Sequence, residues 1–193
     1  MMGGIGDKAP RHYRVFNHWL LVISPSGDRA TMYEPNTGRT RPIQLGEENQ
    51  APIQVQPVVA AGLLVLNQNG PGIIRTAVFV ESEATWYPSD LKAPVESTSP
   101  TIVDGKTALI ETADHLYLWN GDAKRWDPQA LPRGTSRPGF APGSSISTVA
   151  YETEGHIYKY DFEKGKWVDI DTRQLLSRGE NEGERPARDA EPK

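Results

Sequence analysis

The sequence predicts an all-β protein that is built from four similar units. Short apolar stretches alternate with turns that carry Gly, Asp or Asn, and no window shows a helical periodicity long enough to compete. One type of segment, an aromatic residue followed by a turn and a second short strand, recurs four times along the chain. A proline stands at a similar distance before each recurrence. These regularities indicate a repeat protein of short antiparallel strands.

The recurring segment sets the phase of the repeat. Its first aromatic residues lie 46, 40 and 41 residues apart, at Tyr33, Phe79, Trp119 and Tyr160. Seven positions after each of them stand Thr40, Trp86, Trp126 and Trp167. Large rings at matched positions are typical of packing between neighbouring units, where each ring buries about 150–250 Å². We expect the three tryptophans to be buried at equivalent positions.

Four prolines in the same phase mark where the units begin: Pro10, Pro57, Pro100 and Pro142. The predicted repeats cover about residues 10–56, 57–99, 100–141 and 142–172, after an N-terminal tail of residues 1–9. Residues 173–193 are predicted to form a disordered charged tail, because no apolar residue larger than Ala follows Leu176.

Each unit contains two further apolar pieces ahead of its aromatic segment. In the third unit they are TIVDG (101–105) and TALIET (107–112). The matching pairs are RVFN and HWLLVIS in the first unit, VVAAG and LLVLNQ in the second, and SSIST and VAYETE in the fourth. Together with the aromatic segment, these pieces predict four short strands in every unit.

Four strands for every 40 to 50 residues, roughly, is the signature of a β-propeller blade. An isolated blade has two apolar faces, and stacking against neighbours buries both. The sequence therefore predicts a β-propeller built from four four-stranded repeats. The ring is either four-bladed, or half of an eight-bladed ring that a dimer shares.

The aromatic segments resemble the ends of known propeller repeats. YLWNGDAKRWDPQALP and YKYDFEKGKWVDID are similar to the end of a kelch repeat, in which Tyr-Asp before a Gly-rich turn is followed by Trp. MYEPNTGRTRPIQL is more similar to the Thr-Gly turn of quinoprotein-type propellers. The paired glycines of kelch repeats are absent from LLVLNQ, TALIET and VAYETE, and Thr40 replaces Trp in the first unit. The resemblance implies the propeller fold and no membership of either family.

Composition excludes several classes of function. The 193 residues carry a formal charge of −4, which gives no bulk attraction to nucleic acid or to anionic lipid. The chain has no cysteine, so disulfides, thiol nucleophiles and thiolate metal sites are excluded. The longest apolar run, WLLVI from Trp19, is far shorter than the roughly 20 residues of a membrane span. We see no secretory signal at the start, and the compartment stays open.

The candidate site is a ring of basic side chains. His115 and His156 each stand two residues before the Tyr of a predicted third strand, and Arg75 and Arg29 occupy the same place before Ala77 and Thr31. Equivalent positions in a propeller point to equivalent places around its axis. Such a ring could hold a carboxylate, a phosphate or an acidic peptide, and the alternative is a set of solvated turn residues.

Signals for catalysis and metal binding are weak. Gly143–Ser145 is not a nucleophile elbow, and NQNGPG from Asn67 precedes no helix and is no phosphate loop. As metal ligands the two histidines lack a carboxylate at fixed spacing, although Asp114 is adjacent to His115. We expect no cofactor and no catalytic residue.

Two interpretations follow from the sequence. The first is a non-enzymatic module that presents the loops of one rim to a protein or an anionic peptide, with a homodimer possible and with no nucleic acid or membrane as partner. The second is a small propeller that binds a carbohydrate, haem or a metal, and that could be a hydrolase. Function depends on the site more than on the fold, and the ring of basic side chains favours the first interpretation.

Overall fold

The computed structural model describes residues 12–46, 51–94, 101–104, 107–131, 150–153 and 155–174. The chain divides into two compact units, Met1–Arg133 and Gly134–Lys193, and each is described by itself. The tail predicted at residues 1–9 and the tail residues from 175 onward lie outside the described residues, as do Pro10, Pro100, Pro142 and the stretch SSIST.

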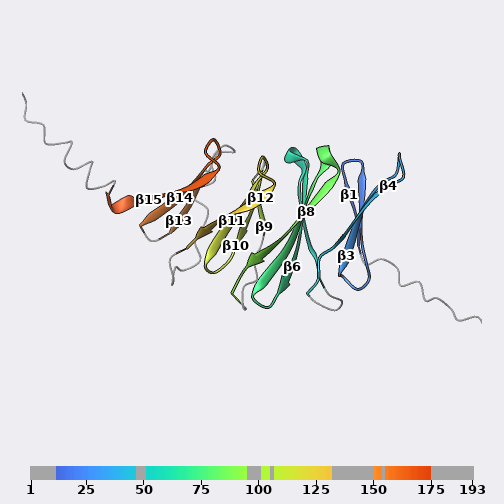
Figure 1. Ribbon diagram of the computed structural model, residues 1–193, viewed down its shortest axis with the longest axis horizontal. Helices are drawn as coiled ribbons and strands as arrows, with labels where there is room; N and C mark the ends of the chain where they lie inside the picture. Colours follow the sequence, from blue (N-terminus) through green and yellow to red (C-terminus); the bar gives the residue numbers. More distant parts are fainter. Residues whose placement is uncertain are drawn as a thin grey trace, which may run out of the picture. The chain divides into compact units, whose positions relative to one another are not determined.

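The first unit contains three four-stranded antiparallel sheets, each formed by consecutive strands (Figure 1). The first sheet consists of β1 (His12–Phe16), β2 (Trp19–Ile23), β3 (Arg29–Glu34) and β4 (Arg39–Gln44). The second consists of β5 (Gln54–Val58), β6 (Leu63–Gly70), β7 (Ile73–Val80) and β8 (Thr85–Lys92), with 3-10 turns η1 (Val59–Ala61) and η2 (Glu81–Glu83). The third consists of β9 (Thr101–Asp104), β10 (Thr107–Glu111), β11 (His115–Asn120) and β12 (Arg125–Ala130).

The second unit contains a sheet of β13 (Ala150–Thr153), β14 (His156–Asp161) and β15 (Lys166–Asp171) within its described residues. The protein is therefore all-β, with four antiparallel sheets. Because the two units are described separately, closure of a four-bladed or shared ring stays a prediction.

Strand register confirms the phase of the repeat. The aromatic residue of each third strand pairs directly with the residue seven positions later: Tyr33 with Thr40, Phe79 with Trp86, Trp119 with Trp126, and Tyr160 with Trp167. In three of these pairs the two rings are in contact, with centroids 5.1, 5.6 and 5.3 Å apart.

The turn between the third and fourth strands is also the same in each repeat. Five positions after the first aromatic residue, the backbone is left-handed, with φ values of 71°, 49°, 54° and 58° at Gly38, Ala84, Lys124 and Gly165. Glycine adopts this conformation without steric cost, whereas alanine and lysine adopt it against their preference. The shared turn explains why every hairpin keeps the same register.

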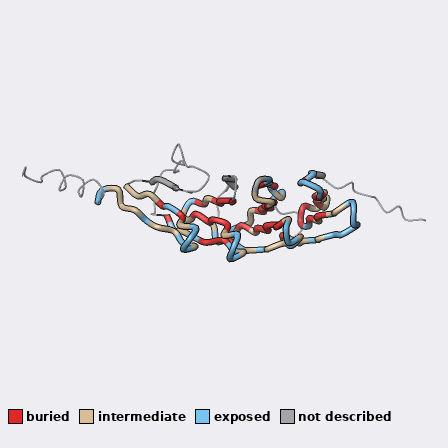
Figure 2. Tube along the Cα trace, turned by 90° about the horizontal axis from the view of Figure 1, so that it is seen from above, coloured by how far each residue is buried: buried red, intermediate tan, exposed pale blue. Residues whose placement is uncertain are grey.

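Figure 2 shows buried segments in the sheets of the first unit, and their apolar side chains form two layers. Between the first and second sheets, Trp19, Leu21 and Met32 pack with Leu66 and Phe79. Between the second and third sheets, a matching layer is formed by Val65, Ile74, Val78, Ile110, Trp119 and Trp126. The second sheet is thus buried on both faces, as the continuous apolar run of β6 requires.

The tryptophans differ in burial, which corrects the expectation that all three are buried. Trp126 is buried, whereas Trp86 and Trp167 are only partly buried. All three lie in the edge strand of their sheets, where burial depends on the neighbouring sheet. Trp126 belongs to the core layer between the second and third sheets, whereas Trp86 only packs against the layer between the first and second.

The start of the second repeat also differs from the expectation. Its first strand runs from Gln54 to Val58, so Pro57 lies inside a strand, and Val59–Ala61 form a 3-10 turn in place of the expected VVAAG strand. Proline is tolerated here because β5 is an edge strand and has a neighbour on one side only.

A second set of prolines, which lie in edge strands, was not predicted from the sequence. Pro42, Pro88 and Pro128 each stand nine positions after the first aromatic residue, in the outer edge strands β4, β8 and β12. They pair with Thr31, Ala77 and Tyr117. A residue without an N–H group hinders another strand from adding to that edge.

Candidate binding rim

Strand register places the predicted basic residues at equivalent positions. Arg29, Arg75, His115 and His156 each pair with the residue 15 positions later, which is Gln44, Asp90, Ala130 and Asp171. Three of them lie in the first unit: Arg29 and His115 begin β3 and β11, and Arg75 is the third residue of β7. We call Arg29, Arg75 and His115 the third-strand rim.

Arg29 is the most exposed member of the rim, with 67% of its side chain accessible. Its Nε lies 3.2 Å from Oδ2 of Asp28, which is buried. Asp28 also accepts hydrogen bonds from the hydroxyl groups of Ser26 and Ser24, the latter at 2.8 Å. These hydrogen bonds, that of Ser26 first, lower the pKa of Asp28, and the carboxylate stays charged beside the guanidinium.

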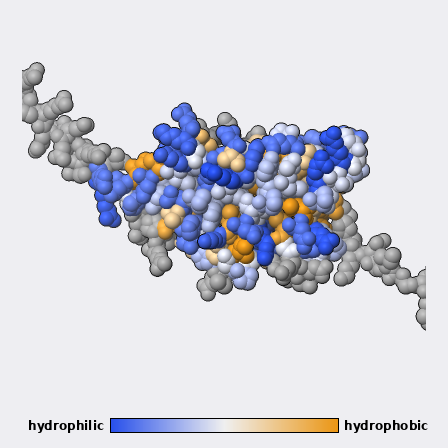
Figure 3. All heavy atoms as spheres, viewed as in Figure 1, coloured by the Kyte–Doolittle hydropathy of each residue, from blue (hydrophilic) through white to orange (hydrophobic). Residues whose placement is uncertain are grey.

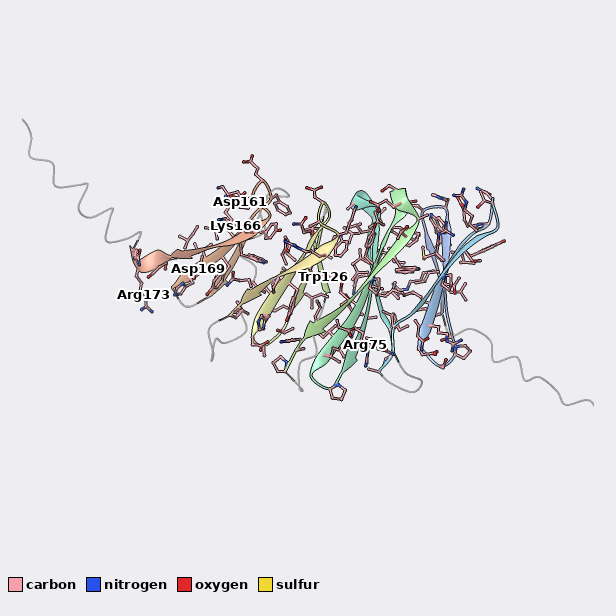
Figure 4. All side chains as sticks on the ribbon, in the orientation of Figure 1. Arg75, Trp126, Asp161, Lys166, Asp169 and Arg173 are labelled. Atoms are coloured by element: carbon pink, nitrogen blue, oxygen red, sulfur yellow. The ribbon has the colours of Figure 1, made fainter. Side chains whose placement is uncertain are left out.

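Arg75 lies in β7 between Gln68 of β6 and Asp90 of β8, near the turn that joins β6 to β7 (Figure 4). A Cβ atom at Gly70 would stand 3.2 Å from Nη1 of Arg75. The glycine therefore leaves room for the guanidinium group against the backbone of this turn. The Arg75 side chain is partly buried, in contrast to that of Arg29.

His115 is held by two neighbours. Its Nδ1 lies 3.0 Å from Oδ1 of Asp114, and its ring stacks on Tyr117 with centroids 5.5 Å apart. Burial acts to raise the pKa of Asp114, but hydrogen bonds from His115 and Thr112 outweigh it, so this pKa is lowered. The Tyr117 hydroxyl in turn donates to the carbonyl oxygen of Lys92 at 2.7 Å, which ties the third sheet to the second.

His156 has the same surroundings in the second unit. Its Nδ1 lies 2.8 Å from Oδ1 of Asp169, and its ring stacks on Tyr158 with centroids 6.0 Å apart. Asp169 and Arg173 lie toward one end of this sheet, whereas Asp161 and Lys166 lie toward the other (Figure 4). The pattern His-x-Tyr therefore produces the same stacked pair twice.

Carboxylates lie beside several of the basic side chains, and most of these carboxylates were not predicted from the sequence. Asp28 and Asp114 precede Arg29 and His115 directly, and this adjacency is visible in the sequence. Asp169 reaches His156 only across the β14–β15 ladder, so strand register was needed to find it. At Arg29 and His115 a carboxylate therefore lies beside the basic side chain, which weakens the field of the rim over long distances.

The opposite rim, where third strands end, is occupied by contacts between sheets. His18 lies between Glu34 and Glu81, with its two ring nitrogens 3.3 and 3.1 Å from their carboxylate oxygens. Lys124 of the third sheet contacts Glu83 of the second, and the Tyr87 hydroxyl also donates to Glu83. The hydrogen bond from Lys124, followed by that from Tyr87, lowers the pKa of Glu83.

Metal and membrane signals are absent from the described part of the chain. No group of three or more His, Asp or Glu side chains there could hold a metal ion. None of its helices is long and apolar enough to span a membrane.

No known protein family matches the sequence, and no curated protein matches it. Solved structures match this chain at low identity, and the three that follow have TM-scores below 0.5. A protein of unknown function from Desulfotomaculum acetoxidans has a TM-score of 0.42 at 11% identity, over 82% of this chain and 54% of its own. Dihydro-heme d1 dehydrogenase NirN has 0.40 at 11%, over 81% and 35%. Hsv2 from Kluyveromyces marxianus has 0.37 at 12%, over 82% and 58%. This chain spans less than two thirds of each of these chains, and no residue role is transferred from them.

Proposed function

We infer that the protein is a binding module that presents the third-strand rim of its first unit to a protein or peptide carrying carboxylates. The observation that supports this proposal most is the shared register of Arg29, Arg75 and His115, which repeats one basic position in three sheets that pack together. The proposal is also supported by the contacts of His18 with Glu81 and of Lys124 with Glu83, which engage these charged groups of the opposite rim between sheets.

Recognition at this rim would act at short range. An arginine has five N–H donors, and the contact with Asp28 involves Nε of Arg29. A partner's carboxylate could share the same guanidinium group as a planar, charge-assisted acceptor. Because Asp28 and Asp114 already balance charge locally, we expect affinity to depend on these direct contacts more than on attraction from a distance.

The test is selection of a random peptide library on the immobilised protein, followed by affinity measurement for the enriched peptides. We expect enrichment of Asp and Glu, and at least about tenfold weaker binding to the Arg29→Ala/Arg75→Ala double variant, since a charge-assisted hydrogen bond contributes roughly 1.5–3 kcal/mol. The matched control is Arg39→Ala/Arg125→Ala, which removes the same charge where β4 and β12 begin, on the opposite rim. Peptides without acidic bias, or equal losses in both double variants, would contradict the proposal.

A further inference from the structure

The outer edge strands of the first three repeats share a proline that the fourth repeat lacks. Pro42, Pro88 and Pro128 stand nine positions after the first aromatic residue, in β4, β8 and β12. The residue at this position of the fourth repeat is Asp169, in β15. Among the outer edge strands of the four described sheets, β15 alone keeps a backbone N–H group at this position.

Strand register shows that this position faces the open side of each edge strand. Near the end of each strand, one backbone N–H group donates inward to the carbonyl oxygen before the third strand: Leu45 to Asp28, Ala93 to Gly72, Leu131 to Asp114 and Thr172 to Gly155. Successive N–H groups along a strand point to opposite sides. The three prolines and Asp169 each stand an odd number of positions before the donating residue, so their nitrogen atoms point away from the sheet. The prolines therefore remove a donor from the open edge, whereas Asp169 presents one.

The edge of β15 can accept a further strand. Within the described residues, β15 pairs with β14 alone. The N–H group of Asp171 points in the same direction as that of Asp169, because the two residues are two positions apart. An edge strand that keeps such groups is a template for strand addition, which proline hinders elsewhere.

The side chains of β15 indicate which strand would fit. Pairing with β14 places Asp169 and Asp171 on one face of the sheet, and Val168 and Ile170 on the other. The Asp169 side chain is 49% exposed, and its contact with His156 involves Oδ1. Figure 3 shows hydrophilic and hydrophobic residues side by side in the region where Figure 1 labels β14 and β15. Opposite charges and β-branched residues form favourable pairs across a ladder, so a strand in which basic and β-branched residues alternate is complementary to this edge.

A second copy of β15 is a poor partner for the same edge. When a twofold axis relates two antiparallel strands, residues of the same face pair with each other, so the aspartates of both copies would lie on one face. Like charges across a ladder are destabilising. Basic residues opposite Asp169 and Asp171 avoid this cost.

We propose that the outer edge of β15 binds an extended segment of another protein by strand addition, and that basic and β-branched residues alternate in this segment. Backbone hydrogen bonds hold the segment, and the aspartates select its charge. This site lies in the second unit and takes a basic segment, whereas the third-strand rim lies in the first unit and takes carboxylates. The two proposals are therefore independent, and the failure of one leaves the other intact.

The test is fluorescence anisotropy of a labelled peptide, KVKVYE, titrated with the full chain up to about 1 mM. Aligned antiparallel to β15, this peptide places lysines opposite Asp171 and Asp169, and valines opposite Ile170 and Val168. We expect saturable binding, and at least about tenfold weaker binding of the charge-swapped peptide EVEVYK, whose glutamates lie opposite the aspartates. No binding of KVKVYE, or equal affinity for both peptides, overturns the proposal.

Two variants separate the backbone donor from the carboxylate. Asp169→Ala and Asp169→Pro both remove the carboxylate and its contact with His156, but only proline also removes the outward N–H group. We expect Asp169→Pro to bind KVKVYE at least about fivefold more weakly than Asp169→Ala, which is the matched control. Proline occupies this position in the other three outer edge strands, so the variant should fold. Equal affinities of the two variants would contradict strand addition.

Amide hydrogen exchange of the wild type gives a measurement that needs no variant. Excess KVKVYE should slow exchange at Asp169 and Asp171, whose N–H groups point to the open edge. Exchange at Val168 and Ile170 should change little, because their N–H groups point toward β14. Unchanged exchange at both aspartates would show that the peptide binds elsewhere and would overturn the proposal.

Discussion

The indole Nε1 of Trp86 donates a hydrogen bond to the carbonyl oxygen of Arg41 at 2.8 Å, across the boundary between the second and first sheets. The Nε of Arg41 donates back to the carbonyl oxygen of Ala84 at 2.7 Å. The outer edge strand β4 is thereby fastened to the hairpin of the next repeat by two reciprocal bonds. Trp126 occupies the same register position, but its Nε1 has no hydrogen-bond partner among the described residues.

Replacement of the Trp86 indole by benzothiophene tests this bond. The substitution exchanges the N–H group for sulfur with little change of shape, and we expect it to lower the free energy of unfolding by about 1 kcal/mol, the net contribution of one hydrogen bond. The same replacement at Trp126 should have almost no effect. Urea unfolding of both variants gives the comparison, and equal losses would show that the bond contributes nothing specific.

The left-handed turn gives a second prediction. Gly38→Ala should lower the free energy of unfolding by about 1 kcal/mol, because φ is 71° at this residue while nothing lies within 4 Å of the added Cβ atom. The loss would therefore come from backbone strain alone.

Gly121→Ala is the control for that substitution. Gly121 lies in the equivalent turn of the third repeat, its φ is outside the left-handed region, and a Cβ atom there also meets nothing within 4 Å. We expect no loss, or a gain of roughly 0.4–1 kcal/mol from the stiffer unfolded chain. If chemical denaturation shows the same loss for both alanine variants, the turn conformation is not its cause.

Acid should destabilise the turn between β2 and β3. The folded pKa of Asp28 lies below the usual value of 3.8, because Ser26 and Ser24 donate hydrogen bonds to the carboxylate. Protonation of Asp28 then favours the unfolded chain. Its contribution to the free energy of unfolding is therefore complete above pH 3.8 and is lost as the pH falls through the folded pKa. We expect the melting temperature to fall in this range.

A Ser24→Ala/Ser26→Ala variant should lose part of this acid dependence, since its Asp28 carboxyl lacks both hydroxyl donors. Thermal melts of the variant and the wild type between neutral and acidic pH give the comparison. Parallel curves would assign the acid effect to other carboxyl groups, such as Asp161, whose pKa the hydrogen bond from Lys164 lowers.

The sequence by itself determined the repeat and the pairing of its third and fourth strands. Partners such as Trp119 and Trp126 are seven residues apart, so local alternation and turn chemistry set their register. The same reasoning correctly aligned Arg29, Arg75, His115 and His156, because each lies in such a hairpin.

Only the tertiary structure determined the contacts between sheets. The bond from Trp86 to Arg41 joins residues 45 positions apart, and the unequal burial of Trp86 and Trp126 depends on how far a neighbouring sheet reaches over the edge strand. Asp169 meets His156 only across the β14–β15 ladder, which spacing along the chain does not reveal. The repeat determines the strands because it depends on residues that are close together in the chain. Contacts between distant residues form only when the sheets pack, because spacing along the chain does not fix distance in space.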